Sequence, residues 1–338
     1  MKKYIFILIF ICTLFCGCQR QQKMEEIQLF AMDTFIDLKA SGENGREALL
    51  KAEKEINQLE KLFSTTLEQS EIAQINKNAG QSAIPVSEDS FYLIQKAKEF
   101  YQKTDGAFDI TIAPVVKAWG FTEEVKKVPS TEELQQKLQL VNNDKIHMEN
   151  NTVLLEQQGM AIDLGGIAKG YASDKINEIL KQEGITSAVL NLGGNVSVIG
   201  KKENHKKWQI GIQDPLEEEK LAGILSVEDC SVITSGVYQR FFEQDDKRYH
   251  HIIDSKTGRP AETGLLSVTI ISKNGTMADA LSTSFMIMGM EKSSDLWKKS
   301  DDFSAIFITD KKEIYVTQDI ADAFALEQSE YTLHIIEK

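Results

Sequence analysis

The chain has 338 residues, of which 42% are hydrophobic and 26% are charged, which is enough for one large domain or two coupled lobes. Its 51 Asp and Glu residues outnumber its 38 Lys and Arg residues, and the formal net charge is -13. Such a surface repels a nucleic-acid backbone, so we expect no nucleic-acid partner, and an anionic ligand needs a local trap of backbone N–H groups, a lysine or a metal ion.

The N-terminus has the features of a bacterial export signal. Two lysines precede an apolar run from Tyr4 to Phe15, which is too short to span a bilayer comfortably and ends in Leu14-Phe-Cys-Gly-Cys18, a sequence that resembles a lipobox. We therefore expect a signal peptide at residues 1–18, a lipid on Cys18, and a polar tether at residues 19–27. The mature lipoprotein would be anchored in the membrane and face the periplasm, and an ordinary secretory signal or an uncleaved anchor is the alternative.

The cysteines are consistent with export and with the absence of disulfides. Cys12 and Cys16 leave with the signal and Cys18 carries lipid, so the mature chain retains Cys230. Val232 and Ile233 follow it closely, and we interpret Cys230 as a buried small side chain rather than a catalytic thiol.

Helices are expected to dominate the first part of the exported chain. Residues 32–38 have the pattern of a strand, and apolar residues recur at helical spacing in residues 43–63. Further helices are indicated by the residues that begin them, which are N-caps at Ser70, Ser87 and Ser130 and a first-turn proline, Pro114.

Strands are expected to dominate the later part. A hairpin signal at Asn150-Asn151 joins two short strands, and helices are expected at residues 170–183 and 278–288. The other predicted strands are residues 188–192, 208–212, 221–227, 249–253 and 266–272, and a hairpin near residues 306–316 closes the chain. The expected class is α+β, with a mostly antiparallel sheet and flanking helices in a domain of residues 28–338, and a soft boundary between two lobes near residue 143.

A glycine-rich loop, Asp163-Leu-Gly-Gly-Ile-Ala-Lys169, precedes one of these helices. Adjacent glycines let a backbone approach a ligand closely, and the N-terminus of the following helix offers N–H groups to a phosphate. Lys169 adds positive charge, and Asp163 could bind a ribose or a ring. The alternative is a structural turn between strand and helix with Lys169 in solvent.

Asp279 and Thr283 are four residues apart on a predicted helix, so their oxygen atoms share one face. A carboxylate and a hydroxyl suit Mg²⁺, which keeps waters and substrate phosphates as its other ligands. The alternative is that Asp279 stabilises the first helical turn and Thr283 bonds to the preceding turn.

Two histidines, His250 and His251, enter a strand followed by a turn at Thr257-Gly-Arg-Pro260. Adjacent residues of a strand point to opposite faces, so the two cannot easily hold one metal ion. At most one lines a site, where it could act as a general base, and the alternative is a hydrogen-bonded structural histidine.

These stretches occur together in a fixed order, and the combination resembles the ApbE family of FAD:protein FMN transferases over nearly the whole exported chain. The motifs that carry the resemblance are Met32-Asp-Thr-Phe, Phe63-Ser-Thr with Ser70-Glu-Ile and Asn76, Gly106-Ala-Phe-Asp-Ile-Thr-Ile-Ala-Pro, Trp119-Gly-Phe, the loop at Asp163, Asn191-Leu-Gly-Gly-Asn, Thr234-Ser-Gly, His251-Ile-Ile-Asp with Thr257-Gly-Arg-Pro, and Ala278-Asp-Ala-Leu-Ser-Thr.

The resemblance implies an FAD site in a cleft between two lobes. The positions that match the family's FAD contacts are Met32, Ala107, Phe108, Asp109, Asp163, Lys169 and Ile253. The resemblance also implies a Mg²⁺ site made of Asp279, Thr283 and the backbone oxygen of Gly166. The position after Ser64-Thr65, which is aromatic in many relatives, is Thr66 here. The loss of an aromatic face at this FAD-site position would weaken flavin retention and favour hydrolysis over transfer.

The activity implied is Mg²⁺-dependent transfer of FMN from FAD to a Ser or Thr hydroxyl of a partner, with release of AMP. His251 is the candidate general base, and Asp279 or an oxygen held by the metal is the alternative. Expected partners are flavin-accepting subunits of membrane redox complexes, such as a Na⁺-translocating quinone reductase or a related electron-transfer complex. A pyrophosphatase that splits FAD to FMN and AMP and a lipid-anchored flavin carrier are the rival functions.

Overall fold

The computed structural model describes residues 23–338 except residues 124 and 203. The predicted signal segment and the predicted lipidation site, Cys18, lie outside the described residues. Among the helices that the structure describes, none combines the length and the apolar character that a membrane crossing needs.

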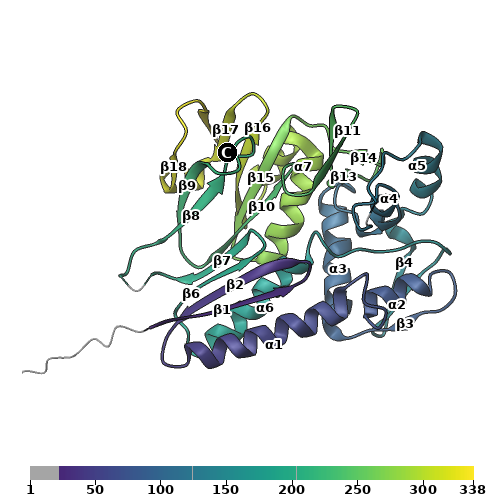
Figure 1. The fold of residues 1–338 in the computed structure, drawn as a ribbon, viewed down its shortest axis with the longest axis horizontal. Helices are drawn as coiled ribbons and strands as arrows, with labels where there is room; N and C mark the ends of the chain where they lie inside the picture. Colours follow the sequence, from purple (N-terminus) through teal and green to yellow (C-terminus); the bar gives the residue numbers. More distant parts are fainter. Residues whose placement is uncertain (1–22, 124, 203) are drawn as a thin grey trace, which may run out of the picture.

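A nine-stranded sheet forms the centre of the molecule (Figure 1). Neighbouring strands pair antiparallel except at one edge, where β17 and β19 are parallel. The order across the sheet is β1 (Met24–Ala31), β2 (Thr34–Ser41), β6 (Ser187–Leu192), β7 (Asn195–Gly200), β10 (Cys230–Gly236), β15 (Leu265–Ser272), β16 (Phe303–Thr309), β17 (Glu313–Thr317) and β19 (Thr332–Ile336). This arrangement confirms the predicted α+β class with a mostly antiparallel sheet.

Three long helices cover one face of this sheet: α1 (Gly45–Phe63), α6 (Ala168–Gln182) and α7 (Gly275–Lys298). The apolar stripe predicted for the first of them is buried, from Ala48 to Phe63. Helix α7 packs against β10, β15 and α6, so most of its first half is buried. The main hydrophobic core lies between these helices and the sheet.

The opposite face of the sheet is covered near its middle by a three-stranded sheet of β8 (Trp208–Gln213), β9 (Leu221–Val227) and β18 (Phe324–Leu326). Trp208 and Leu225 from this small sheet share a second core with Val232 and Ile306 from the large one. Sheet-on-sheet packing therefore fixes the loop that joins β8 to β9 relative to the central strands.

A second lobe of shorter elements lies beside α7 and the C-terminal end of α1 (Figure 1). Its elements are α2 (Glu71–Lys77), β3 (Ile84–Pro85), α3 (Glu88–Lys103), α4 (Ala113–Ala118), α5 (Thr131–Leu138), β4 (Ile146–Glu149) and β5 (Thr152–Leu155). The serine N-caps are confirmed, because Ser70, Ser87 and Ser130 each accept a hydrogen bond from the amide three residues later. The expected lobe boundary near residue 143 falls inside this lobe, since β5 pairs with both β3 and β4.

The N-terminal strand differs from the prediction. Strand β1 begins at Met24 and pairs with β2 along its whole length, so residues 24–27 belong to the sheet rather than to a tether. Met32 and Asp33, expected in a strand, form the turn of the β1–β2 hairpin, and both have positive φ, as the common two-residue hairpin turn requires. The alternation of this edge strand is weak because its exposed face also carries apolar residues, Met24 and Phe30.

Two more elements differ from their predicted residue ranges. The predicted strand at residues 249–253 is broken into β12 (Lys247–His250) and β13 (Ile253–Asp254), which pair with β11 (Phe241–Gln244) and β14 (Arg259–Pro260) respectively. His251 lies at the break. Helix α7 runs ten residues beyond its expected end, to Lys298, with a non-helical break at Gly289.

Candidate active site

A cavity of about 740 Å³ lies where the two lobes meet. Its walls come from the β1–β2 turn, the glycine-rich loop before α6, the first half of α7, the segment around Phe108, and the break between β12 and β13. This volume is within the usual range for small-molecule and cofactor sites. The cavity is therefore the candidate site, and it joins segments that are far apart in the sequence.

Almost all the site residues predicted from the sequence line this cavity. They are Met32, Ala107, Phe108, Asp109, Asp163, Gly166, Lys169, His251, Ile253, Asp279 and Thr283. Thr66 does not line it, although the preceding residues Ser64 and Thr65 do. The Thr66 hydroxyl lies 3.1 Å from that of Ser64 on an exposed turn.

Hydrogen bonds to the second lobe and within the loop itself hold the glycine-rich loop in place. The Asp163 amide donates to the Ile110 carbonyl at 2.9 Å, and one Asp163 carboxylate oxygen accepts from the Gly165 amide at 2.8 Å. Just before the loop, Asn76 bonds both the amide and the carbonyl of Ile162. The loop is thus fixed against the second lobe before any ligand binds.

Most amides of this loop already have partners within the protein. The Gly165 amide donates to Asp163, the Ile167 and Ala168 amides donate to Leu164, and the Gly170 amide donates to Asp279. The sequence pattern suggested that these amides would bind a phosphate. The structure leaves fewer of them for that task, so side chains and a cation must supply more of the attraction.

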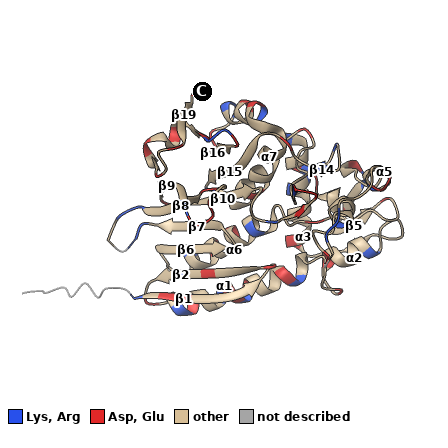
Figure 2. Cartoon of the chain, turned by 45° about the horizontal axis from the view of Figure 1, so that its top comes forward, with Lys and Arg blue, Asp and Glu red and all other residues tan. Residues whose placement is uncertain are grey.

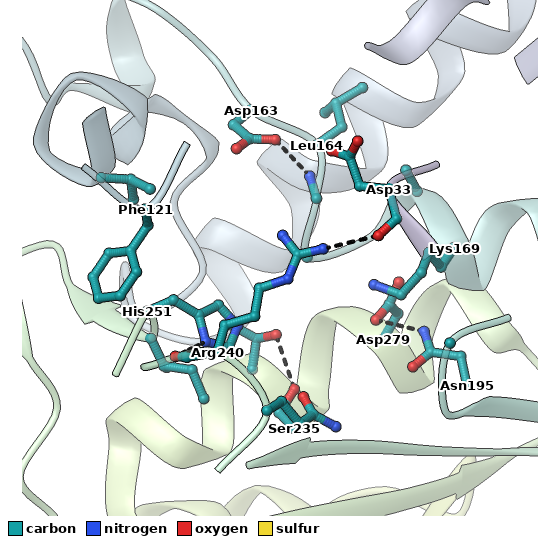
Figure 3. Close-up of a pocket in the computed structure, with 18 of the residues that line it drawn as sticks. Asp33, Phe121, Asp163, Leu164, Lys169, Asn195, Ser235, Arg240, His251 and Asp279 are labelled. Atoms are coloured by element: carbon teal, nitrogen blue, oxygen red, sulfur yellow. Dashed lines mark hydrogen bonds between the residues drawn. The ribbon is translucent and has the colours of Figure 1, made fainter. Parts of the chain in front are cut away.

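Asp279 and Thr283 face the cavity from adjacent turns of α7, as the spacing predicted. One carboxylate oxygen of Asp279 accepts from the Gly170 amide at 2.8 Å, and the other accepts from the Asn195 side-chain amide at 3.0 Å. The Thr283 hydroxyl lies 3.2 Å from that of Ser235 on β10. Figure 3 shows Asp279 beside Lys169, with Asn195 on its other side.

Gly166 brings the loop backbone next to this face of α7. A methyl group in place of its hydrogen would lie 3.1 Å from the Phe108 ring and 3.6 Å from the Thr283 hydroxyl oxygen. The backbone at Gly166 therefore runs between the Phe108 ring and the hydroxyl of Thr283, the predicted metal ligand. A larger residue at this position would crowd both groups.

Helices α6 and α7 cross in close contact directly behind the site. A methyl group on Gly170 would lie 2.2 Å from the Gly275 carbonyl oxygen and 2.6 Å from Asp279 Cβ. Asp174, one turn further along α6, accepts from the Gly275 and Thr276 amides at 2.7 and 2.8 Å. The loop and the carboxylate of the site are thus positioned by one helix crossing.

His251 is oriented by the backbone of Arg240. Its Nδ1 lies 3.1 Å from the Arg240 carbonyl oxygen. A carbonyl can only accept, so Nδ1 carries the proton and Nε2 keeps its lone pair. Burial, with a smaller contribution from the charges of Arg240 and Lys169, lowers the pKa of His251 to about 4, so the ring is neutral at pH 7.

Arg240 was not identified from the sequence, where no local pattern distinguishes it from any other basic residue. Its side chain reaches across the cavity and donates to the Asp33 carbonyl at 3.4 Å (Figure 3). The guanidinium also favours the ionised form of Asp163. Arg240 therefore joins the β1–β2 turn to the segment that holds His251.

The cavity is acidic before any ligand binds. Among the described residues that line it, six carboxylates face two Lys and Arg side chains; the carboxylates are Asp33, Glu60, Asp109, Asp163, Glu218 and Asp279. Burial raises the pKa of Asp109 and of Asp163. Figure 2 shows acidic and basic residues interspersed over the elements, with a basic stretch on the loop that joins β7 to β8. A diphosphate in this cavity therefore needs more positive charge than Lys169 and Arg240 provide.

Two other residues considered from the sequence, His250 and Cys230, do not contribute to the site. His250 is buried and its Nε2 lies 3.1 Å from the Ala261 carbonyl oxygen, as expected for a structural histidine. Cys230 lies on β10 away from the cavity lining, and burial raises the pKa of its thiol to about 12. Such a thiol is protonated at neutral pH and is a poor nucleophile.

Comparisons with known proteins agree with this geometry. The model of the ApbE family matches residues 32–307. The FAD:protein FMN transferase of Klebsiella pneumoniae is 36% identical over 78% of this chain and 82% of its own, and that of Treponema pallidum is 35% identical over 82% and 81%.

Solved structures with the same fold include the ApbE protein from Thermotoga maritima. It is 32% identical, has a TM-score of 0.83, and is matched over 89% of this chain and 99% of its own. The flavin transferase ApbE from Vibrio cholerae is 26% identical, with a TM-score of 0.80 over 89% of this chain and all of its own.

Proposed function

The chain belongs to the ApbE family and transfers FMN from FAD to a partner protein, and we propose that the acceptor is a Ser or Thr hydroxyl, that AMP leaves, and that Mg²⁺ is required. One observation supports this proposal above the others. The glycine-rich loop, the Asp279–Thr283 face of α7 and the unprotonated nitrogen of His251 converge on a single cavity.

The donor atoms around Asp279 fit a magnesium ion. Asp279 and Thr283 provide a carboxylate and a hydroxyl on one helix face, and the Gly166 backbone lies beside them. Among the described residues, no three His, Cys, Asp or Glu side chains form a cluster that could hold a metal by themselves. A site with one carboxylate suits Mg²⁺, whose remaining ligands are waters and substrate phosphates, better than it suits zinc. Excess negative charge in the cavity also favours a divalent cation as the partner of a diphosphate.

The residues of the chain then have separate roles. Asp279, Thr283 and the Gly166 carbonyl would hold the ion, while Lys169 and Arg240 attract the phosphates and Phe108 packs against the flavin end. When bound, magnesium neutralises the diphosphate and the charge that develops on the leaving AMP. Because the helix crossing and the bonds of Asp163 fix these groups in advance, little reorganisation is needed for reaction.

The proposed reaction exchanges one phosphorus–oxygen bond for another. The acceptor oxygen bonds to the FMN-side phosphorus, the bond from that phosphorus to the bridging oxygen breaks, and the electron pair leaves with AMP. His251 Nε2 accepts the acceptor's proton, since its lone pair is unprotonated at neutral pH. The product is FMN joined to the partner through a phosphoester bond.

We expect His251→Gln to lower kcat for transfer by about 10²- to 10⁴-fold, the range for loss of a general base. In the wild-type chain, protonation of His251 should not lower kcat/KM for FAD until the pH falls towards about 4, because that is the pKa of His251 in the free site. Initial rates of acceptor labelling from pH 4 to 8 test both statements. A wild-type acid limb near pH 6.5, the ordinary histidine value, would contradict the second.

The same pKa predicts how stability changes with pH. The folded-state pKa of about 4 is below the ordinary 6.5, so the unfolded chain binds the proton first as the pH falls. His251 therefore lowers the free energy of unfolding progressively from about pH 6.5 to pH 4, and His251→Gln should make that decline shallower in denaturant titrations.

Transfer to a partner is tested by mass spectrometry. The exported chain is incubated with FAD, Mg²⁺ and a purified flavin-accepting subunit of a Na⁺-translocating quinone reductase, the partner class that we propose. A mass gain equal to one FMN on a Ser or Thr of the acceptor supports transfer. Free FMN and AMP with no labelled acceptor would instead identify a pyrophosphatase, and intact FAD would identify a carrier.

We further propose that the chain is exported and anchored through a lipid on Cys18, on the strength of the lipobox-like sequence. Cys18→Ser is expected to move the protein from the membrane fraction to the soluble periplasmic fraction, with transfer activity in solution unchanged. Immunoblots of cell fractions provide the measurement. Equal membrane retention of Cys18→Ser and wild type would contradict the anchor.

A further inference from the structure

Two phenylalanines are exposed at the tip of the β1–β2 hairpin. Phe30 and Phe35 lie directly opposite each other in the pair, and their rings meet edge to face at 5.2 Å. Their side chains remain 63% and 80% exposed. Of the four residues between them, Met32, Asp33 and Thr34 line the cavity. The aromatic pair therefore stands at the mouth of the active site.

Apart from Met24 at the far end, the rest of this face of the hairpin is polar, as expected for a solvated sheet face. The same alternation places Glu26, Gln28, Asp37 and Lys39 on it, and Lys39 makes salt bridges to both carboxylates at 3.3 and 3.4 Å. The change to aromatic residues occurs only in the row of the ladder nearest the cavity. Exposure of this face to solvent does not explain why the row nearest the cavity is aromatic.

Two other strongly exposed apolar residues lie close in the sequence to residues that line the cavity. The four most exposed large hydrophobic residues of the described chain are Phe35, Val125 (75%), Phe30 and Leu216 (51%). Val125 is three residues from Thr122, and Leu216 is two residues from Glu218, both of which line the cavity. We call these four residues the rim patch. Within it, Phe30 and Phe35 form one contiguous exposed apolar surface, and such a surface marks an interaction site, whereas single exposed residues do not.

We propose that the rim patch is the docking surface for the flavin-accepting protein, with Phe30 and Phe35 as its anchors. The inference rests on the proposed function, since an acceptor hydroxyl must enter through this mouth to reach the bound FAD. The partner surface that fits is apolar around the accepting hydroxyl. Asp33, Asp37 and Glu218 beside the patch disfavour an anionic lipid surface as its occupant.

Aromatic side chains that become buried at the centre of an interface commonly account for much of its affinity. The double variant Phe30→Thr/Phe35→Thr removes both rings and keeps residues that suit a strand. The matched control is Leu333→Thr/Ile335→Thr, because these residues are 38% and 45% exposed on β19, the edge strand at the other side of the same sheet. Neither pair lines the cavity.

The probe is the purified quinone-reductase subunit used to test transfer. Its binding to the chain is measured by biolayer interferometry without FAD, its KM is measured in the transfer assay, and FAD affinity is measured by flavin fluorescence. We expect the phenylalanine variant to weaken acceptor binding and raise the acceptor KM by about 10- to 100-fold, with kcat, FAD affinity and thermal stability unchanged. The control variant should stay within about twofold of wild type on every measure.

Several outcomes would overturn the assignment. Unchanged acceptor binding, or no binding by the wild-type chain, would show that the patch does not dock the acceptor. A matching loss of FAD affinity would show that the rings cover the flavin. Wild-type dimers that the phenylalanine variant dissociates would identify a second copy as the occupant. Binding without any FMN transfer by the wild type would contradict the proposed function and leave the docking surface supported.

Discussion

Replacing Asp279 with alanine is expected to lower the rate of FMN transfer at least about 1,000-fold and to abolish its dependence on Mg²⁺. Asp279 provides the carboxylate of the proposed magnesium site, and its loss removes the charge that holds the ion. The variant also leaves the Gly170 and Asn195 donors without their acceptor, which costs about 1–3 kcal/mol of folding free energy. The protein should therefore still fold but be less stable.

The measurement is labelling of the acceptor over a series of Mg²⁺ concentrations, together with thermal unfolding. Asp279→Asn separates charge from shape, since it keeps a hydrogen-bond acceptor and should lose transfer with a smaller loss of stability. Asp295→Ala is the matched control, because Asp295 is an exposed carboxylate on the same helix. Undiminished, Mg²⁺-dependent labelling by Asp279→Ala would rule out this metal site.

Local sequence patterns predicted much of this molecule because the interactions concerned are local. The serine N-caps bond to amides three residues away, and the positive φ of Asn150 and Asn151 closes a hairpin that the pair signals by itself. Asp279 and Thr283 face the same cavity because helical geometry alone places residues four apart together. For these features, a few neighbouring residues contain all the information that is needed.

The features that were missed depend on contacts between distant segments. The place of β1 at the sheet edge follows from its pairing with β2 and from the packing of α1, and its own residues signal it weakly. Arg240 joins the site only because its carbonyl meets His251 and its guanidinium meets Asp33, which is far away in the sequence. The bond of the Gly170 amide depends on Asp279, which lies more than a hundred residues later.

Thr66 illustrates the limit of transferring a role by position. The resemblance placed it at an FAD-contacting position, and the structure places it on an exposed turn outside the cavity lining, bonded to Ser64. Its neighbours Ser64 and Thr65 do reach the cavity. Phe108 and Phe121 line other walls of the cavity, and we expect flavin stacking to come from them instead.

Gly170→Ala is expected to lower both stability and FMN transfer, although alanine is the better helix former. In a helix interior, the exchange alone would stabilise the chain by about 1 kcal/mol. Against this, the new methyl would lie 2.2 Å from the Gly275 carbonyl oxygen and 2.6 Å from Asp279 Cβ, and these backbone and Cβ atoms cannot turn aside as a flexible side chain would. We expect the clash to prevail, with a net cost of about 2–4 kcal/mol.

The relief of this clash would separate α6 from α7 and break the bond from the Gly170 amide to Asp279, so transfer should fall at least about 100-fold. Thermal unfolding and Mg²⁺-dependent labelling provide the two measurements. Gly184→Ala is the control, because Gly184 follows the same helix with a φ of +78° and no atom within 4 Å of the added methyl. It should cost only about 1 kcal/mol and leave transfer intact. If Gly170→Ala matched wild type in both measurements, the helix crossing would not be what positions the metal carboxylate.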